Sequence, residues 1–222
     1  MQPLVAIMPC IPHIPGVNLP NAITVSRLIL TAIFVIAVGF PGTAGYAVAL
    51  VTFSVAAATD WLDGYLARKL GMVTPLGKLL DPLADKILVC AAFVYFSAQP
   101  AVADAAHPHG GYHSPVWVTA LIIAREFLVT GLRQIAVEAG QVLAADKLGK
   151  WKTTFQLTYC ITGLVWLTFS SMEHPGPIGG LLRDLANPKG WLMPLSLWTA
   201  VALTLISGTN YVWASRNLLK GR

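Results

Sequence analysis

Residues 44–69 read AGYAVALVTFSVAAATDWLDGYLARK, an apolar run whose last ten residues include two aspartates. As a helix rising about 1.5 Å per residue, this run is longer than the roughly 30 Å hydrocarbon core of a bilayer. We therefore expect it to cross a membrane, with its Asp60–Lys69 end projecting into the interface. Carboxylates persist beside such sequence when they are paired, bound to metal or facing a watery cavity. The stretch predicts a membrane helix with a functional site at one end.

The composition of the whole chain agrees with a membrane protein. Of 222 residues, 55% are hydrophobic and only 11% are charged, whereas a soluble domain carries about 25% charged residues. The formal net charge of +5 comes mostly from cations in short segments beside apolar runs, which is typical of topology control and of attraction to anionic headgroups. No basic stripe with interleaved aromatic residues is present, so nucleic-acid binding is not expected.

Six apolar stretches each approach the roughly 20 residues that a spanning helix requires. They cover about residues 22–40, 44–69, 74–99, 115–139, 153–171 and 191–214. The expected fold is therefore an all-α polytopic membrane protein with six transmembrane helices. We divide the chain into a juxtamembrane segment (1–21), a six-helix domain (22–214) and a basic tail (215–222). The linkers 100–114 and 172–190 have the composition of solvated loops.

Cations are divided unequally between the two sides that six spanning helices create. The linkers on one side hold only Arg183 and Lys189. By the positive-inside rule the other side is cytoplasmic, together with both termini and the aspartate-bearing helix end. That side holds nine cations, namely Arg68, Lys69, Lys78, Lys147, Lys150, Lys152, Arg216, Lys220 and Arg222.

Four of the ten acidic residues of the chain, Asp60, Asp63, Asp81 and Asp85, fall within 26 residues. On helices, each pair three or four residues apart shares a face. A short turn around 71–74 makes the two helices antiparallel neighbours, so we expect the four carboxylates to converge. Oxygen ligands without Cys or His favour Mg²⁺, Mn²⁺ or Ca²⁺ over zinc. Two such ions shared among carboxylates suit phosphoryl chemistry.

The residues beside the aspartates fit a phosphate-bearing ligand. Gly64 and Ala67 extend the aspartate face with small side chains, and Gly77 permits close approach of a ligand or another backbone. Arg68 can bind a phosphate bidentately. Lys86 is open to two interpretations, pairing with a carboxylate or reaching to the interface.

This segment carries the pattern Asp60-x2-Asp63-Gly64-x2-Ala67-Arg68-x8-Gly77-x3-Asp81-x3-Asp85. At all eight positions it resembles the signature of the CDP-alcohol phosphotransferase family. The resemblance implies transfer of a phosphatidyl-type group from a CDP-linked lipid to an alcohol, with release of CMP, dependence on Mg²⁺ or Mn²⁺, and a homodimeric membrane enzyme. Positioning and charge neutralisation dominate such displacements, and this residue set offers both.

The resemblance also implies a role for each signature residue. The four aspartates hold the metal ions, and Asp85 doubles as the base that deprotonates the acceptor hydroxyl. The CDP moiety is bound by Asp60, Asp63, Gly64, Ala67, Arg68 and Gly77.

Cations outside the signature indicate which kind of acceptor alcohol the protein binds. Arg125 and Arg133 lie eight residues apart in an apolar run, close to the same helical face. Arginines in such runs need anions. Either Glu126 or the signature carboxylates pair with them, or they bind a phosphate on the acceptor together with Lys150 and Lys152. The phosphate pocket is the favoured interpretation.

Three segments resemble the family members whose acceptor is sn-glycerol 3-phosphate. They are Asn18-Leu19-Pro20-Asn21-x2-Thr24-x2-Arg27, Arg125-Glu126-Phe127 and Gly149-Lys150-Trp151-Lys152-Thr153. This resemblance implies CDP-diacylglycerol as the donor, phosphatidylglycerophosphate as the product and the bacterial cytoplasmic membrane as the location. It adds Asn21, Thr24, Arg27 and Glu126 as further site candidates, with Arg27 either neutralising the aspartates or touching the nucleotide.

Other functions stay open at this point. Within the family, inositol phosphate, phosphatidylglycerol and serine are alternative acceptors, and the cations disfavour only the uncharged ones. From a different class, a cation or proton transporter can line its pathway with carboxylates. A transport path distributes such groups across the membrane midplane, whereas these aspartates gather at one face.

Overall fold

The computed structural model describes residues 19–70, 75–99, 112–138 and 147–216. Within these ranges, nothing is described of the side chains of residues 19–23, 60–70, 75–85, 138 and 147. All the regular elements in the described ranges are helices: α1 (Leu19–Val38), α2 (Thr43–Leu70), α3 (Pro75–Ala98), α4 (Val116–Glu138), α5 (Lys147–Ser170), α6 (Gly176–Leu185) and α7 (Leu192–Ala214).

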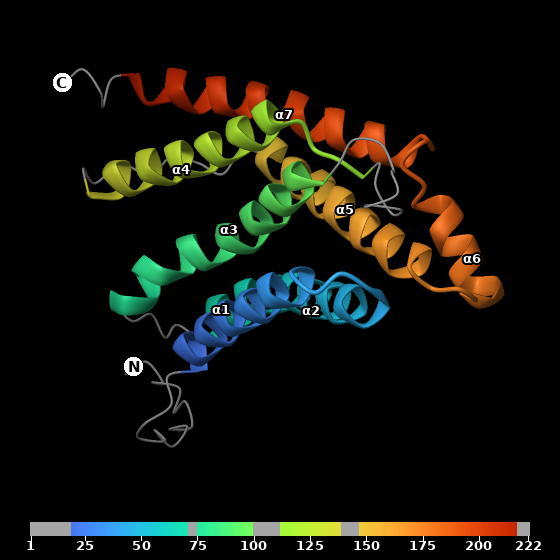
Figure 1. Ribbon diagram of the computed structural model, residues 1–222. Coiled ribbons are helices and arrows are strands. Elements are labelled where there is room, and N and C mark those ends of the chain that lie inside the picture. The colour runs from blue at the N-terminus through green and yellow to red at the C-terminus, as the bar shows by residue number, and fades with distance from the viewer. Residues whose placement is uncertain (1–18, 71–74, 100–111, 139–146, 217–222) are drawn as a thin grey trace, which may run out of the picture.

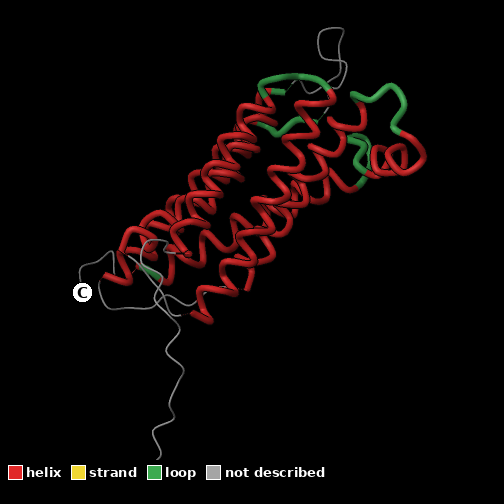
Figure 2. The backbone as a smooth tube through the Cα atoms, turned by 90° about the horizontal axis from the view of Figure 1, so that it is seen from below, coloured by secondary structure: helices red, strands yellow, loops and turns green. Residues whose placement is uncertain are grey.

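The six long helices form one elongated bundle (Figures 1 and 2). α1 packs against α2 and α3, α5 packs against α2 and α7, and α4 packs against α3 and α7. The start of α1 and the end of α7 lie at the same end of the bundle (Figure 1). The short helix α6 lies at the opposite end and packs against α5.

The expected all-helical class is confirmed, and each of the six apolar stretches corresponds to a long helix. The helix count over the described residues is seven rather than six, because the linker 172–190 contains α6. Its prolines and glycines suggested a loop, but proline is tolerated in the first turn of a helix. The basic segment 147–152 lies before the fifth apolar stretch, but it is helical and forms the start of α5. Hydropathy marks only the apolar part of a helix and not its true start.

The apolar character of the helices extends to the outside of the bundle. Among the described residues, α7 is long and apolar enough to cross a membrane by length and composition, and shorter apolar segments lie in α1, α2 and α3. Large apolar side chains are exposed along these helices, including Ile36, Val51, Val94 and Leu195. A soluble monomer rarely exposes apolar patches this extensive, so the surface is consistent with a membrane protein.

Four aromatic rings pack against one another in the core. This aromatic cluster consists of Phe93 and Phe96 of α3, Tyr112 before α4, and Tyr159 of α5, with ring centroids 5.1 to 5.7 Å apart. The Tyr112 hydroxyl donates a 2.6 Å hydrogen bond to the carbonyl of Tyr159. Burial raises the pKa of Tyr112 well above its ordinary value, so this donor stays protonated.

Gly163 of α5 closes the aromatic cluster. A Cβ at this position would lie 2.5 Å from the Tyr112 ring and 2.6 Å from the Phe96 ring. Only glycine therefore fits while the rings keep these positions.

Candidate active site

The aspartates of the signature lie on the two helix segments that adjoin residues 71–74. Asp63 lies seven residues before the end of α2, and Asp81 lies six residues after the start of α3. Asp60 and Asp85 are both ten residues from the same helix ends. At about 1.5 Å per residue, the inner pair and the outer pair each lie at matching distances, about 10 Å and about 15 Å, from the helix ends that adjoin residues 71–74. The backbone register is thus compatible with one carboxylate cluster.

The other predicted ligands of CDP lie on the same helix segments. Gly64, Ala67 and Arg68 belong to α2 and Gly77 belongs to α3. Their side chains, like those of the four aspartates and of Asn21 in α1, lie outside the described residues. Their predicted contacts stay predictions.

α1 carries a stripe of buried polar side chains, at a distance from its helix end similar to that of the aspartates on α2 and α3. Thr24, Arg27 and Thr31 are each at most 5% exposed, and α1 packs against both α2 and α3. Arg27 lies eight residues into α1, or about 12 Å along its axis. A buried guanidinium requires anionic or hydrogen-bonding partners. α1 therefore carries a buried positive charge against the helix pair that bears four acids.

The predicted cations outside the signature meet at one cavity. This cationic cavity has a volume of about 440 Å³ and lies between α3, α4, α5 and α7. Glu126 is the one acidic side chain among its lining residues. The cations that line it are Lys86, Arg125, Arg133, Lys150 and Lys152.

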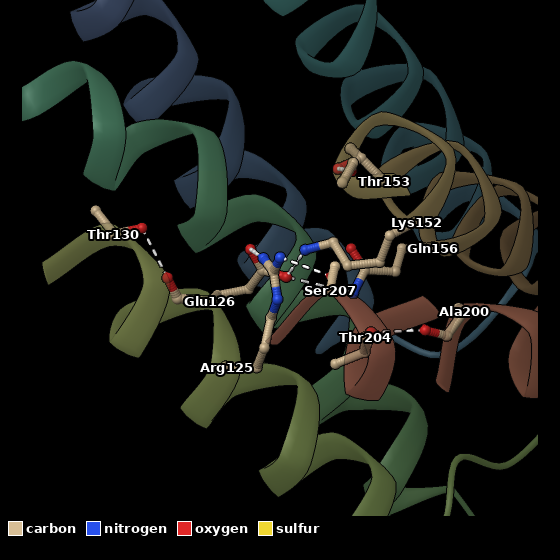
Figure 3. A network of polar contacts seen from close by, with 10 residues as sticks. Arg125, Glu126, Thr130, Lys152, Thr153, Gln156, Ala200, Thr204 and Ser207 are labelled. Atoms are coloured by element: carbon tan, nitrogen blue, oxygen red, sulfur yellow. Dashed lines mark hydrogen bonds and ion pairs between the residues drawn. The ribbon is translucent and has the colours of Figure 1, made fainter. Parts of the chain in front are cut away.

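Glu126 is the centre of a buried polar network in this cavity (Figure 3). One of its oxygens accepts a hydrogen bond from the ammonium of Lys152 and lies 3.5 Å from the amide nitrogen of Gln156. Its other oxygen lies 3.6 Å from a guanidinium nitrogen of Arg125. Lys152 is only 2% exposed, so its charge is compensated inside the protein.

Tyr211 of α7 orients the two arginines of α4. The guanidinium of Arg125 lies 5.9 Å from the centre of its ring, and that of Arg133 lies 5.4 Å from the same centre. Both are within the range of cation–π attraction. Arg125 also donates a 2.8 Å hydrogen bond to Ser207 (Figure 3). The two arginines thus reach the same ring, as their eight-residue spacing suggests.

The contacts of these four cations divide them into two pairs. Arg125 and Lys152 pair with Glu126. Arg133 and Lys150 are exposed and form no ion pair with any residue that the structure describes. The charges of the first pair are therefore compensated by Glu126, while those of the second pair are not compensated by any carboxylate that the structure describes.

Sequence reasoning missed the place of two residues in the cavity. Tyr211 lies in the polar run Ser207–Tyr211 near the end of an apolar helix, and such a run is the signal that could have found it. Lys86 had two interpretations, and the structure shows it lining the cavity. Because Lys86 directly follows Asp85 on α3, the cavity begins at the depth of that aspartate.

Five cations around one carboxylate make the cavity a strong attractor for anions. Guanidinium groups bind phosphate oxygens in a bidentate geometry, and ammonium groups add point charges. The cavity is thus suited to a phosphorylated ligand that lies beside the aspartate-bearing segment of α3.

Comparisons with known proteins agree with a ligand that carries phosphate groups. Residues 17–206 match the family model of CDP-alcohol phosphatidyltransferase. A Bacillus subtilis (strain 168) protein is 37% identical over 216 residues, covering 91% of this chain and 97% of its own. An Escherichia coli (strain K12) protein is 37% identical over 72% of this chain and 82% of its own, and one from Pseudomonas fluorescens is 39% identical over 63% and 68%. All three are named CDP-diacylglycerol–glycerol-3-phosphate 3-phosphatidyltransferase.

Proposed function

The chain belongs to the CDP-alcohol phosphatidyltransferase family, and on that premise we propose how it works. It is an enzyme of phospholipid biosynthesis that transfers the phosphatidyl group of CDP-diacylglycerol to sn-glycerol 3-phosphate, which gives phosphatidylglycerophosphate and CMP. The observation that carries the choice of acceptor is the cationic cavity, because four of its five cations are those predicted to bind a phosphate. The names of the relatives agree with this acceptor.

The acceptor phosphate binds to Arg133 and Lys150, which are exposed and line the cavity. Arg125 and Lys152 support this site from within, because their pairing with Glu126 fixes their positions while their positive charges still act on the cavity. The phosphate group anchors the acceptor, and its glycerol end then points toward Asp85, the neighbour of Lys86 along α3. This arrangement uses remote binding energy to position the reacting hydroxyl.

The four aspartates fit a divalent-metal site. They supply only oxygen ligands, which Mg²⁺ and Mn²⁺ prefer, and their matching distances from the adjoining ends of α2 and α3 support this proposal. Asp60, Asp63, Asp81 and Asp85 would hold two such ions. When bound, the ions supply charge neutralisation at the oxygens of the pyrophosphate. Arg68 adds a guanidinium to the same pyrophosphate, and Gly64, Ala67 and Gly77 leave room for the CDP moiety.

Asp85 takes the proton of the primary hydroxyl of the acceptor. The freed oxygen attacks the phosphorus that bears the diacylglycerol and forms a new P–O bond. The bond from this phosphorus to the CMP oxygen breaks, and CMP leaves with the electron pair. A carboxylate base acts only within hydrogen-bond reach of the hydroxyl, which the position of the acceptor phosphate provides. Asn21, Thr24 and Arg27 lie on α1 at the side of the donor site, where Arg27 balances the charge of the aspartates.

The proposed topology follows from the helices and the cations. The six long helices span the bacterial cytoplasmic membrane, with both termini and the active site facing the cytoplasm, and α6 lies on the opposite side. The segments 1–21 and 215–222 flank this domain. We expect a homodimer in the membrane, which light scattering of the detergent-solubilised protein will test.

The deciding experiment measures CMP release from CDP-diacylglycerol in detergent with Mg²⁺. The acceptors are sn-glycerol 3-phosphate, inositol 1-phosphate, serine and phosphatidylglycerol, each with an EDTA control. We expect release with sn-glycerol 3-phosphate alone and its loss with EDTA. Release with a different acceptor would overturn the assignment of the cationic cavity, and release unaffected by EDTA would overturn the metal site. Folded protein that releases no CMP with any acceptor would favour a transporter.

A further inference from the structure

A second cavity, with a volume of about 460 Å³, lies between α4 and α7. We call it the α4–α7 groove. Its walls are mainly apolar and include Leu121 and Leu128 of α4 and Leu205 and Val212 of α7. Leu128, Leu205 and Val212 are all exposed. The groove therefore opens onto the apolar outside of the bundle, where a hydrocarbon chain fits better than a water-soluble ligand.

One end of the groove carries a cation. Arg216 follows the last turn of α7 and lines the groove together with Trp213. Its guanidinium lies 4.7 Å from the centre of the Trp213 ring, and it forms no ion pair with a residue in the described part of the chain. Tryptophan and arginine at a helix end are typical of the headgroup level of a membrane.

The groove shares Arg125 with the cationic cavity. The stem of this arginine crosses between α4 and α7 over Gly208, where an added Cβ would lie 3.2 Å from its Cγ. Its guanidinium reaches Ser207 and Glu126 on the other side. A ligand in the groove would thus contact the stem of a residue whose head belongs to the cationic cavity.

We propose that the α4–α7 groove is a binding site for one anionic phospholipid, separate from the donor and acceptor sites. One acyl chain lies along Leu128, Leu205 and Val212, and the phosphate of the headgroup binds Arg216. A net negative headgroup is favoured, because the ammonium of a zwitterionic one would meet the same guanidinium. The inference rests on the proposed function for its setting in a membrane, and the product of that reaction is itself an anionic phospholipid.

The test is lipid binding to the full chain in detergent, measured by native mass spectrometry. Phosphatidylglycerol and phosphatidylcholine with the same acyl chains are titrated separately. We expect one phosphatidylglycerol to bind about tenfold more tightly than phosphatidylcholine, a difference of about 1.4 kcal/mol. Arg216→Gln should remove this preference, and Leu205→Trp, which fills the groove, should weaken both lipids. Arg183→Gln on α6 changes a partly exposed cation that does not line the groove and should leave binding unchanged.

Three results would overturn the proposal. The first is equal binding of both lipids to the unaltered chain, and the second is an unchanged preference in Arg216→Gln. The third is displacement of the bound phosphatidylglycerol by CDP-diacylglycerol with Mg²⁺, which would make the groove part of the donor site. CMP release is measured on the same samples and should persist in Arg216→Gln. Loss of lipid preference with normal CMP release therefore separates this site from the proposed function.

Discussion

The cationic cavity and the aromatic cluster both contact one continuous face of α5, but one is lined by charged side chains and the other by aromatic rings. Lys152 and Gln156 join the polar network around Glu126, whereas Tyr159 and Gly163, one and two turns further on, pack among aromatic rings. The spacing of these four positions on α5 is that of one buried stripe. Within this stripe, one half is specified by charge and the other half by shape.

The difference shows what each half contributes. Close-packed rings stabilise a fold through complementary shape and tolerate little added volume. A buried ion network contributes little net stability, because desolvation offsets its attraction, although removing one partner is costly. The chain thus keeps a close-packed aromatic half that holds the helices in place, and a polar half whose charges we propose to serve a ligand. The predictions below test this division.

Asp85→Asn should have the largest effect, and on activity alone. Loss of a general base lowers the rate by about 10² to 10⁴-fold, so CMP release should fall by about three orders of magnitude. Thermal unfolding should change little, since both side chains have the same shape. Asp184→Asn on α6 is the matched control and should keep full activity. Normal turnover in Asp85→Asn would remove Asp85 as the base.

Glu126→Gln should have the largest effect on stability. It leaves Lys152 and Arg125 without their carboxylate, and breaking a buried pair costs about 3–5 kcal/mol. The melting temperature in detergent should fall clearly, and a second change, Lys152→Met, should recover part of the loss. Asp184→Asn breaks the exposed pair with Arg183 and should cost at most about 1 kcal/mol. Equal effects of the two carboxylate substitutions would contradict the central role of Glu126.

Gly163→Ala should destabilise the protein without changing its chemistry. The added Cβ collides with the rings of Tyr112 and Phe96, and overpacking of this kind costs about 1–3 kcal/mol. The melting temperature should fall, while the KM values for both substrates stay the same well below the transition. Gly180→Ala on α6 meets no atom within 4 Å and serves as the control. A changed acceptor KM in Gly163→Ala would show that the two halves are not independent.

Arg133→Ala should change substrate binding more than stability. Losing a hydrogen bond to a charged group costs about 1.5–3 kcal/mol, so we expect the KM for sn-glycerol 3-phosphate to rise about tenfold or more. The KM for CDP-diacylglycerol should stay the same. Steady-state kinetics with each substrate varied in turn makes this measurement. A rise in the donor KM alone would assign Arg133 to the other site.

Tyr211→Leu should have the smallest of these effects. It removes the ring over which Arg125 and Arg133 lie, and a cation–π contact contributes about 0.5–1 kcal/mol at exposed sites. The acceptor KM should rise by about two- to fivefold. Tyr211→Phe keeps the ring and should behave like the unaltered chain. If both substitutions raise the KM equally, the hydroxyl and not the ring is what matters.

Much of this fold could be predicted because its signals are local. Apolar stretches predicted all six long helices, since about 20 apolar residues already specify a helix in lipid. α6 was not predicted, although Ile178, Leu181, Leu182 and Leu185 follow the spacing of an amphipathic helix. The prolines around Gly176 obscured that pattern, which is only ten residues long.

The candidate site could also be predicted only in part. The spacing of the aspartates and the cations beside apolar runs predicted which residue types would bind a phosphorylated lipid and its acceptor. The spacing alone left open whether Arg125 and Arg133 pair with Glu126 or bind a ligand. The structure shows that Arg125 contacts Glu126 and that Arg133 forms no ion pair with a described residue, because ion pairing depends on distances of a few ångströms.

The sequence by itself determined the helical class, the family and the gathering of acids on two successive helices, because hydropathy and motif spacing act over neighbouring residues. Only the tertiary structure decided that Lys86, Arg133, Lys150 and Tyr211 line one cavity, and that Glu126 takes Lys152 and Arg125 as its partners. It also decided that α4 and α7 enclose a groove ending at Arg216. The physical reason is that these contacts join helices far apart in the chain, and packing sets their geometry.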